Sequence, residues 1–122
     1  MCGIFFKYCK QNIDQDDRRK TKVKISKYLA KRGPDGFNEA FDDNWYALHS
    51  LLSITHNKNI QPLTVSDRFI ITYNGELYND WSKYTSNYGD TDFLKSHINK
   101  HGIDGLKTLD GEYAIIIYDS KQ

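Results

Sequence analysis

The spacing of the apolar segments is the feature that most limits the fold of this chain. Strand-like runs and helical patterns follow in the order strand, helix, strands, helix, strand, with no internal repeat. The strands are expected at residues 2–9, 45–56, 68–73 and 112–119, and the helices at residues 17–31 and 91–100. This order fits an antiparallel sheet with helices segregated against it better than a repeated βαβ array, so the predicted class is α+β. The last run is hydrophobic enough for a strand covered on both faces.

Charge and cysteine content narrow the classes of function. Seventeen lysines and arginines against sixteen aspartates and glutamates leave a net charge of +1, which favours neither nucleic acid nor a membrane surface. No apolar run is long enough to span a bilayer, and no signal-peptide pattern is present. Cys2 and Cys9 do not make a disulfide framework. We therefore expect a cytoplasmic protein of one domain, or part of one, without nucleic-acid or membrane partners.

The first expected helix is strongly basic. Val23, Ile25, Tyr28 and Leu29 form a narrow apolar stripe, and lysines and arginines occupy most of the remaining surface. A solvated face is the favoured interpretation. The alternative is a basic surface for an acidic partner or a membrane.

The second expected helix is amphipathic. Phe93, Leu94 and Ile98 are predicted to face inward, and Gly102 follows as a stop signal. Asp90 stands where an N-cap residue belongs, which gives it a structural interpretation independent of any site.

Cys2, directly behind the initiator methionine, has a particular chemical option. Removal of Met1 would leave one residue with both a thiol and a free α-amine, whose pKa near 8 lets it act as a base. The thiolate is a strong nucleophile, and a nearby base can generate it. An ordinary strand that begins with cysteine is the alternative, and the first six residues alone do not separate the two.

Two glycine-containing motifs have both a structural and a functional interpretation. In residues 32–36, Gly33 is predicted to cap the first helix and to leave Arg32 at its foot. Asn74-Gly75 follows a strand and is first of all a turn signal. The Asn amide and the Gly N–H are also two donors of the kind that hold a developing oxyanion. On spacing alone the turn is favoured.

His97 and His101 share one face of the second helix. A metal site would need further ligands, and no His-Glu-x-x-His pattern is present. We expect two exposed residues near a helix C-terminus, where partial positive charge is favourable, and no metal.

The remaining polar residues do not assemble into a known constellation. No glycine-rich phosphate loop is present, so the chain shows no ATP site of its own. Four carboxylates are available for acid–base chemistry, but nothing in the sequence brings two of them together. They are Glu76, Asp90, Asp110 and Glu112.

Several motifs occur together in an order that is more specific than any of them alone. They are Met-Cys-Gly-Ile, Arg-Gly-Pro-Asp-Gly, Leu-Ser-Ile followed by Gln-Pro, Tyr-Asn-Gly-Glu-Leu-Tyr-Asn, Asp-Thr-Asp and the final hydrophobic run. With them the chain resembles the class II glutamine amidotransferase domain of the asparagine-synthetase type over essentially its whole length. The resemblance implies an N-terminal-nucleophile hydrolase fold, a four-layer α/β/β/α sandwich of antiparallel sheets. Residues 1–122 would form a partial domain, because the family domain continues beyond the strand that ends at Asp119.

The resemblance also implies a reaction. Cys2, after removal of Met1, would attack the side-chain amide of glutamine, with its own α-amine as the base. Asn74 and the Gly75 N–H would stabilise the oxyanion, and a γ-glutamyl thioester would release ammonia before its hydrolysis to glutamate. Arg32 would support the region of the nucleophile.

Glutamine would be held by residues from several segments. Glu76 and Asp90 match positions that bind it, Asp90 by meeting its α-ammonium group. Leu51, Ser53 and Ile54 fall at the positions of a further binding segment, where the family has Arg-Leu-Ser-Ile. Leu51 replaces the arginine that would pair with the substrate carboxylate, a loss that an isobutyl group does not make good. The Glu of the family's Asp-Thr-Glu is Asp92, a shorter carboxylate.

Two function classes follow. The first is a glutamine-hydrolysing amidotransferase domain whose ammonia serves asparagine synthesis, and it is preferred to the phosphoribosylamine and glucosamine-phosphate branches. No cofactor is expected in this chain, and ATP and Mg would belong to a separate synthetase domain. That domain on another polypeptide, or a homo-oligomer, would complete the assembly. The second class is a catalytically silent binding or regulatory module, favoured by Leu51 and by the short C-terminus.

Overall fold

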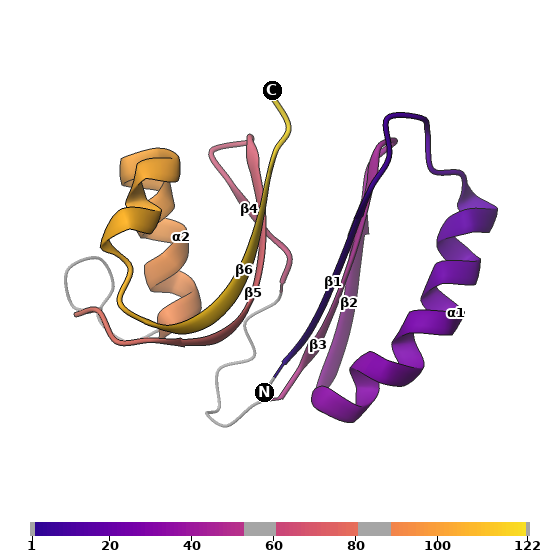
Figure 1. The fold of residues 1–122 in the computed structure, drawn as a ribbon, viewed down its shortest axis with the longest axis horizontal. Helices are drawn as coiled ribbons and strands as arrows, with labels where there is room; N and C mark the ends of the chain where they lie inside the picture. Colours follow the sequence, from indigo (N-terminus) through magenta and orange to yellow (C-terminus); the bar gives the residue numbers. More distant parts are fainter. Residues whose placement is uncertain (1, 53–60, 81–88, 122) are drawn as a thin grey trace.

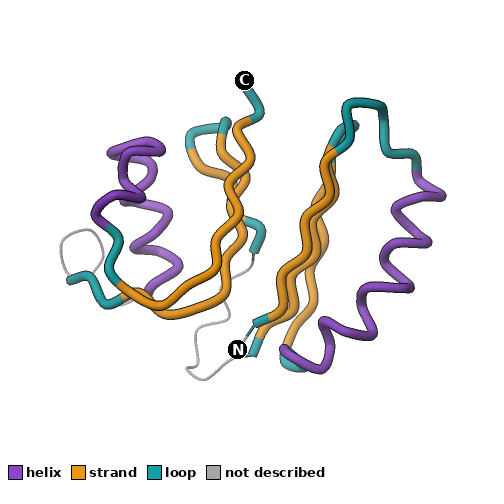
Figure 2. Tube along the Cα trace, viewed as in Figure 1, coloured by secondary structure: helices purple, strands orange, loops and turns teal. Residues whose placement is uncertain are grey.

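A computed structural model describes residues 2–52, 61–80 and 89–121. Two three-stranded antiparallel sheets stack face to face, with one long helix against the outer face of each sheet (Figure 1). The layers therefore follow in the order α1, first sheet, second sheet, α2, and Figure 2 shows the two groups of strands between the helices. The α+β class with antiparallel sheets is confirmed, and the arrangement is compatible with a sandwich.

The first sheet has the order β1-β3-β2 and is antiparallel throughout. Its strands are β1 (Gly3–Tyr8), β2 (Gly36–Phe41) and β3 (Trp45–Leu51). The expected strands at residues 2–9 and 45–56 correspond to β1 and β3, although residues 53–60 lie outside the described part. Strand β2 was not predicted, because it is a short edge strand with polar residues whose pairing to β3 determines its conformation.

The second sheet has the order β4-β5-β6. Its strands are β4 (Leu63–Val65), β5 (Phe69–Leu77) and β6 (Gly111–Asp119). The prediction of a turn at Asn74-Gly75 is wrong, because β5 runs through both residues and remains paired with β6 as far as Leu77. The prediction that the last strand is covered on both faces is also wrong. Strand β6 lies at the edge of its sheet, and its side chains are half-buried or exposed.

Helix α1 (Gln15–Arg32) starts two residues before the expected range of 17–31 and packs through a narrower stripe than predicted. The Asp14 carboxylate accepts a hydrogen bond from the Asp17 N–H at 2.7 Å, which caps the N-terminus. Leu29 is buried and Ile25 is partly buried, whereas Val23 and Tyr28 are 59% and 65% exposed. One helix on one sheet buries only the side chains that point at the sheet, so the predicted stripe is wrong at these two positions.

Helix α2 (Asp90–His101) continues into a 3₁₀ helix, η2 (Gly102–Thr108), that was not predicted. Phe93, Leu94 and Ile98 are buried against β5, as expected. The N-cap residue is Gly89, and the helix begins at Asp90, so the prediction that Asp90 caps the helix is wrong. No helix in the described part of the chain combines the length and the apolar character that crossing a bilayer would require.

The two sheets are held together by an apolar cluster at one end. Trp45, Ala47 and Ile70 are buried there, and Phe6 stacks on Trp45 with ring centroids 5.8 Å apart. Tyr118 of β6 packs against the same two rings. This cluster keeps the faces of β1, β3, β5 and β6 in contact.

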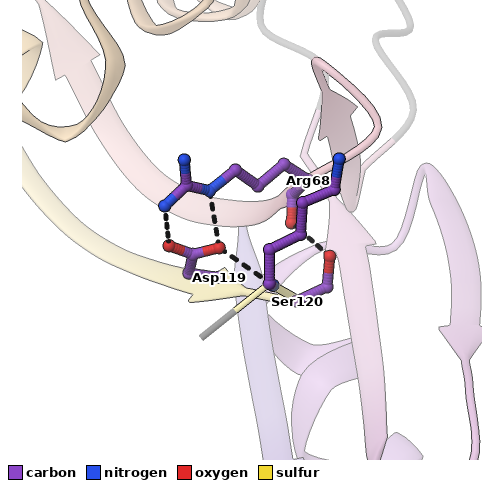
Figure 3. Close-up of polar contacts among 4 residues, drawn as sticks. Arg68, Asp119 and Ser120 are labelled. Carbon is purple, nitrogen blue, oxygen red and sulfur yellow. Dashed lines mark hydrogen bonds and ion pairs between the residues drawn. The ribbon is translucent and has the colours of Figure 1, made fainter.

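A bidentate ion pair fixes the register of β5 and β6 at the same end (Figure 3). Arg68 Nε and Nη2 donate to the two carboxylate oxygens of Asp119 at 2.8 and 2.6 Å. The Ser120 N–H and hydroxyl both donate to the Arg68 carbonyl, at 3.0 and 2.8 Å. These bonds tie the start of β5 to the end of β6, and the register they hold sets which residues lie at the opposite end of the sheet.

Candidate active site

Cys2 directly precedes β1, and the N-terminal end of the chain lies at the opposite end of the sandwich from the C-terminus (Figure 1). The thiol is free and half-buried. Gly3 next to it packs against α1, since a Cβ there would lie 2.6 Å from Ser50 Oγ and 2.9 Å from a Leu29 methyl carbon. Because side chains alternate along a strand, Cys2 belongs to the opposite face, towards the second sheet.

The start of β1 is anchored through Ser50. The Gly3 N–H donates to Ser50 Oγ at 3.1 Å, and the Ser50 hydroxyl donates to the Leu29 carbonyl at 2.6 Å. All three residues are buried. The backbone that carries Cys2 is thus fixed to both β3 and α1.

The C-terminal end of α1 lies beside Ser50 and the start of β1. Gly33 caps the helix as predicted, with its N–H on the Leu29 carbonyl at 3.1 Å. A Cβ at Gly33 would lie 2.5 Å from the Ser50 carbonyl, so glycine lets the helix end pack directly on β3. Arg32 Nε donates to the Cys2 carbonyl at 3.4 Å, which brings these two predicted site residues together.

Asn74 and Gly75 come from the second sheet. Tyr73 and Leu77 pack on the α2 side of β5, whereas Ile70 joins the cluster between the sheets. By the same alternation Asn74 belongs to the face that looks towards the first sheet, the face on which Cys2 lies. Gly75 has φ of +144°, and a Cβ there would lie 2.1 Å from the Glu112 carbonyl oxygen. The backbone at this position is one that only glycine can adopt.

Asp90 and Thr91 begin helix α2, and Thr91 contacts Tyr73 of the second sheet. The hydroxyls of Tyr73 and Thr91 are 2.8 Å apart, and both residues are buried. Burial raises the pKa of the Tyr73 phenol, and the Asp90 carboxylate raises it further by its charge and as a hydrogen-bond acceptor. The Thr91 hydroxyl acts in the opposite direction, and the Cys2 thiol adds a small further rise in the pKa. Asp90 is the first residue of α2, and Thr91 next to it places the start of this helix against Tyr73 of β5.

Glu76 is exposed and lies directly opposite Glu112 in the β5–β6 ladder. Nothing in the sequence indicated that two carboxylates would meet, because the pairing depends on the register of distant strands. The carboxylates of Glu112, Glu76 and Asp110 raise the pKa of Tyr78, after a larger contribution from burial. Like charges directly opposite each other destabilise a strand pair. Glu76 is exposed, so water weakens the repulsion within this acidic patch.

Leu51 is the last residue of β3 and lies opposite Gly36 of β2. Its carbonyl accepts a hydrogen bond from the Asp35 N–H at 2.9 Å, so the 32–36 segment folds onto this end of β3. The side chain is partly buried. Ser53 and Ile54, the other two residues predicted in this binding segment, lie outside the described residues.

His49 is a buried residue that belongs to none of the predicted site motifs. It is 2% exposed, and it lies on the inter-sheet face of β3, opposite Ile4 and Asn38. Its Nε2 has no hydrogen-bond partner in the described part of the chain. Burial lowers its pKa to about 4, so the imidazole is neutral near pH 7. The available signal was a histidine inside a largely apolar run.

His97 is not the exposed residue that was predicted. It is 6% exposed, and its Nε2 lies 3.0 Å from the Gly105 carbonyl and 2.8 Å from Thr108 Oγ1. Helix η2 folds back over α2 and covers it. Among residues 2–52, 61–80 and 89–121, no group of three or more His, Cys, Asp or Glu is placed to bind a metal ion.

Comparison with known proteins assigns the chain to a family. The family model described as a glutamine amidotransferase domain matches residues 1–122, and the chain belongs to that family. An asparagine synthetase domain-containing protein of Saccharomyces cerevisiae is 31% identical over 98% of this chain. A glutamine-hydrolysing asparagine synthetase of the same yeast is 33% identical over 100% of the chain, and asparagine synthetase B of Escherichia coli is 29% identical over 100%.

The matched region is a fraction of each relative. The chain covers 27%, 23% and 24% of the length of these three proteins. What the similarity shows is therefore a glutamine amidotransferase domain of the asparagine-synthetase type. The remaining three quarters of each relative have no counterpart in residues 1–122.

Proposed function

We propose that this domain hydrolyses glutamine to glutamate and ammonia, with Cys2 as an N-terminal nucleophile. The observation that carries the proposal is that the candidate residues come from two sheets that face each other. Cys2 directly precedes β1 of the first sheet, and Asn74 and Gly75 lie on strand β5 of the second sheet, which contacts β1. The proposal includes the N-terminal-nucleophile hydrolase fold that this arrangement resembles.

The first half of the reaction forms a thioester. Removal of Met1 frees the Cys2 α-amine, which takes the thiol proton, and the thiolate attacks the side-chain amide carbon of glutamine. A C–S bond forms, and the carbonyl oxygen becomes an oxyanion that accepts hydrogen bonds from the Asn74 amide and the Gly75 N–H. The oxyanion collapses, the C–N bond breaks, and the leaving nitrogen takes the proton and departs as ammonia.

The second half regenerates the thiol. The α-amine accepts a proton from water, and the resulting hydroxide attacks the γ-glutamyl thioester to give a second oxyanion held by the same two donors. The C–S bond breaks, the Cys2 thiolate takes the proton back from the α-ammonium, and glutamate leaves. Arg32, bonded to the Cys2 carbonyl, would keep the nucleophile oriented through both steps.

Glutamine would be held by Asp90 through its α-ammonium group and by Glu76 beside the oxyanion donors. Asp90 is suited to a cation because it carries a carboxylate in the first turn of α2 and is only partly buried. Leu51 supplies no charge for the α-carboxylate. We therefore propose that glutamine binds more weakly here than it would to a domain with arginine at this position.

The fate of the ammonia is proposed from the relatives. Two of the three proteins compared above are named as asparagine synthetases, so the ammonia is proposed to serve asparagine synthesis. That step would take place in a synthetase domain on the same or another polypeptide, and ATP and Mg would belong there. A cytoplasmic location follows from this role.

A second candidate function is a silent module that binds glutamine or a related ligand without turnover. Leu51 is the observation that favours it, because losing the carboxylate partner weakens substrate binding without touching Cys2. Glutamine hydrolysis by the purified domain separates the two candidates. The Cys2→Ala variant is expected to lose hydrolysis completely, while Cys9→Ala, which changes the other half-buried thiol, is expected to retain it. Equal loss in both variants would exclude Cys2 as the specific nucleophile.

A further inference from the structure

Gln61 connects the two sheets from a position just before β4. The residue is 4% exposed, and its backbone carbonyl accepts a hydrogen bond from the Asn38 side-chain amide of β2 at 2.8 Å. Its side-chain Oε1 accepts two bonds from β5, one from the Tyr73 N–H at 2.8 Å and one from the Thr72 hydroxyl at 3.3 Å. The proposed reaction gives Gln61 no role, although it is the first residue of the Gln-Pro motif.

The bond to Tyr73 lies on the edge of β5 along which β4 runs. Leu63 is opposite Ile71 in this antiparallel pair, so the same register continued by two residues puts Gln61 opposite Tyr73. Strand β4 begins only at Leu63, and at the next position the Gln61 side chain takes the place of a strand partner. A buried backbone N–H needs an acceptor, and this side chain provides it.

Gly75 follows Tyr73 on the same edge of β5. In an extended strand the N–H groups of residues i and i+2 point to the same edge, so the Gly75 N–H points away from β6. The Tyr78 N–H, three residues further along, donates to the Asp110 carbonyl at 2.7 Å on the β6 side, as this alternation requires. Among the described residues, Gln61 is therefore the last partner on this edge before the proposed oxyanion donor Gly75.

Asn74 lies between these two backbone groups. On the other edge of β5 the segment is paired with β6, where Asn74 is opposite Ala114 and Gly75 is opposite Tyr113. The Gln61 side chain holds the segment from the edge that β6 does not reach. A shift of the strand at Tyr73 would move both the Asn74 amide and the Gly75 N–H.

We propose that Gln61 is a positioning residue that holds Tyr73, and through it Asn74 and Gly75, where the two donors meet the oxyanion. The inference rests on the proposed function and deepens it, because it gives the Gln-Pro motif a part in stabilising the transition state. A displaced donor loses much of its effect on the rate and changes substrate binding little. The expected signature is a lower kcat with an unchanged KM.

Steady-state glutamine hydrolysis by Gln61→Met tests the inference, because methionine is similar in length and volume and is only a weak acceptor. We expect kcat to fall about tenfold and KM to stay within about twofold. In an Asn74→Ala background the same substitution is expected to lower kcat by about threefold or less, since one of the two donors is already absent. An equal fall in both backgrounds would show that Gln61 acts independently of Asn74 and would overturn the inference.

Two further variants separate positioning from packing. Thr72→Val removes the longer bond to Oε1 and leaves the bond from Tyr73, so kcat is expected to stay within about twofold of wild type. A loss in Thr72→Val as large as in Gln61→Met would overturn the role of the Tyr73 bond. If Gln61→Met does not fold, Gln61→Asn takes its place with the same expected results, because its amide is one methylene shorter and does not reach Tyr73.

The outcomes separate this inference from the proposed function. A wild-type domain that does not hydrolyse glutamine would overturn both. A wild-type domain that hydrolyses glutamine, with an unchanged kcat in a Gln61→Met variant shown by circular dichroism to be folded, would overturn the role of Gln61 alone. A rise in KM with an unchanged kcat would assign Gln61 to substrate binding and would also overturn it.

Discussion

Gly75 of β5 lies directly opposite Tyr113 of β6, in a backbone conformation with φ of +144°. A Cβ at Gly75 would lie 2.1 Å from the Glu112 carbonyl oxygen and 2.5 Å from the Tyr113 Cα. The paired strands β5 and β6 thus approach each other closely at Gly75, the residue whose N–H is proposed to stabilise the oxyanion. The close approach of the strands and the proposed chemistry both depend on the absence of a side chain here.

Gly75→Ala is therefore expected to lower the free energy of unfolding by at least about 3 kcal/mol, from backbone strain and the clash with β6. Chemical denaturation followed by circular dichroism measures it. Gly36→Ala is the matched control, since a Cβ there would meet only Leu51, at an ordinary 3.5 Å. A loss in Gly75→Ala no larger than in Gly36→Ala would contradict the close approach of β5 and β6.

Asn74→Ala should lower kcat for glutamine by about 10²–10³ with little change in KM, because an oxyanion donor acts on the transition state. Glutamate release under saturating glutamine gives kcat directly. Asn79→Ala is a control on the same segment: that amide donates to the Thr108 carbonyl at 2.8 Å and accepts from the Asp110 N–H at 2.7 Å. It is expected to cost stability and leave kcat unchanged. A rise in KM alone for Asn74→Ala would assign Asn74 to ground-state binding.

Leu51→Arg is expected to lower KM for glutamine, by about tenfold or more if the guanidinium reaches the α-carboxylate. The segment 32–36 folds onto this end of β3, so the substitution places a cation at a position fixed by the Asp35–Leu51 hydrogen bond. Leu51→Met, similar in size and uncharged, should behave as wild type. An unchanged or higher KM in Leu51→Arg would mean that another group already meets the carboxylate.

His49 links stability to pH. Its pKa is lowered to about 4 by burial, from an unfolded value near 6.5, so between these values the unfolded chain binds more protons. The stabilising contribution is complete above about pH 6.5 and is lost as the pH falls towards 4. Between pH 7 and pH 5 the expected loss is about 2 kcal/mol in the free energy of unfolding.

The His49→Leu variant isolates that contribution from those of the carboxylates. Its free energy of unfolding should fall by about 2 kcal/mol less than that of the wild type between pH 7 and pH 5. Denaturation curves at the two pH values give the comparison. Parallel pH dependences would mean that the imidazole finds a partner or solvent in solution.

Periodicity predicted the elements whose own sequence has a clear apolar pattern and missed β2, β4 and η2. The apolar runs at β1, β3, β5 and β6 and the patterns at α1 and α2 carry their own signal. Strands β2 and β4 are stabilised by their pairing with β3 and β5. The 3₁₀ helix η2 is stabilised by its contact with α2, where the Gly105 carbonyl meets His97. Such elements depend on tertiary contacts that no local pattern contains.

The candidate site also combines residues that the sequence predicted with residues that only the structure reveals. Asn74-Gly75 has the composition of a turn, but pairing with β6 keeps it extended, so local propensity gave the wrong structure at a residue proposed to be functional. The sequence placed Cys2, Arg32 and Asp90 as candidates one by one. Tyr73 and His49 could be recognised only from the structure, because each is distinguished by its burial and its contacts and not by a sequence pattern.

The most direct test of Cys2 as an activated N-terminal nucleophile is intact mass after incubation with 6-diazo-5-oxo-norleucine, a glutamine analogue that alkylates such thiols. We expect a product that has lost Met1 and carries one adduct, at Cys2, with Cys9 unmodified. A folded chain that keeps Met1, or a processed chain that does not label, would contradict it and favour the silent binding module.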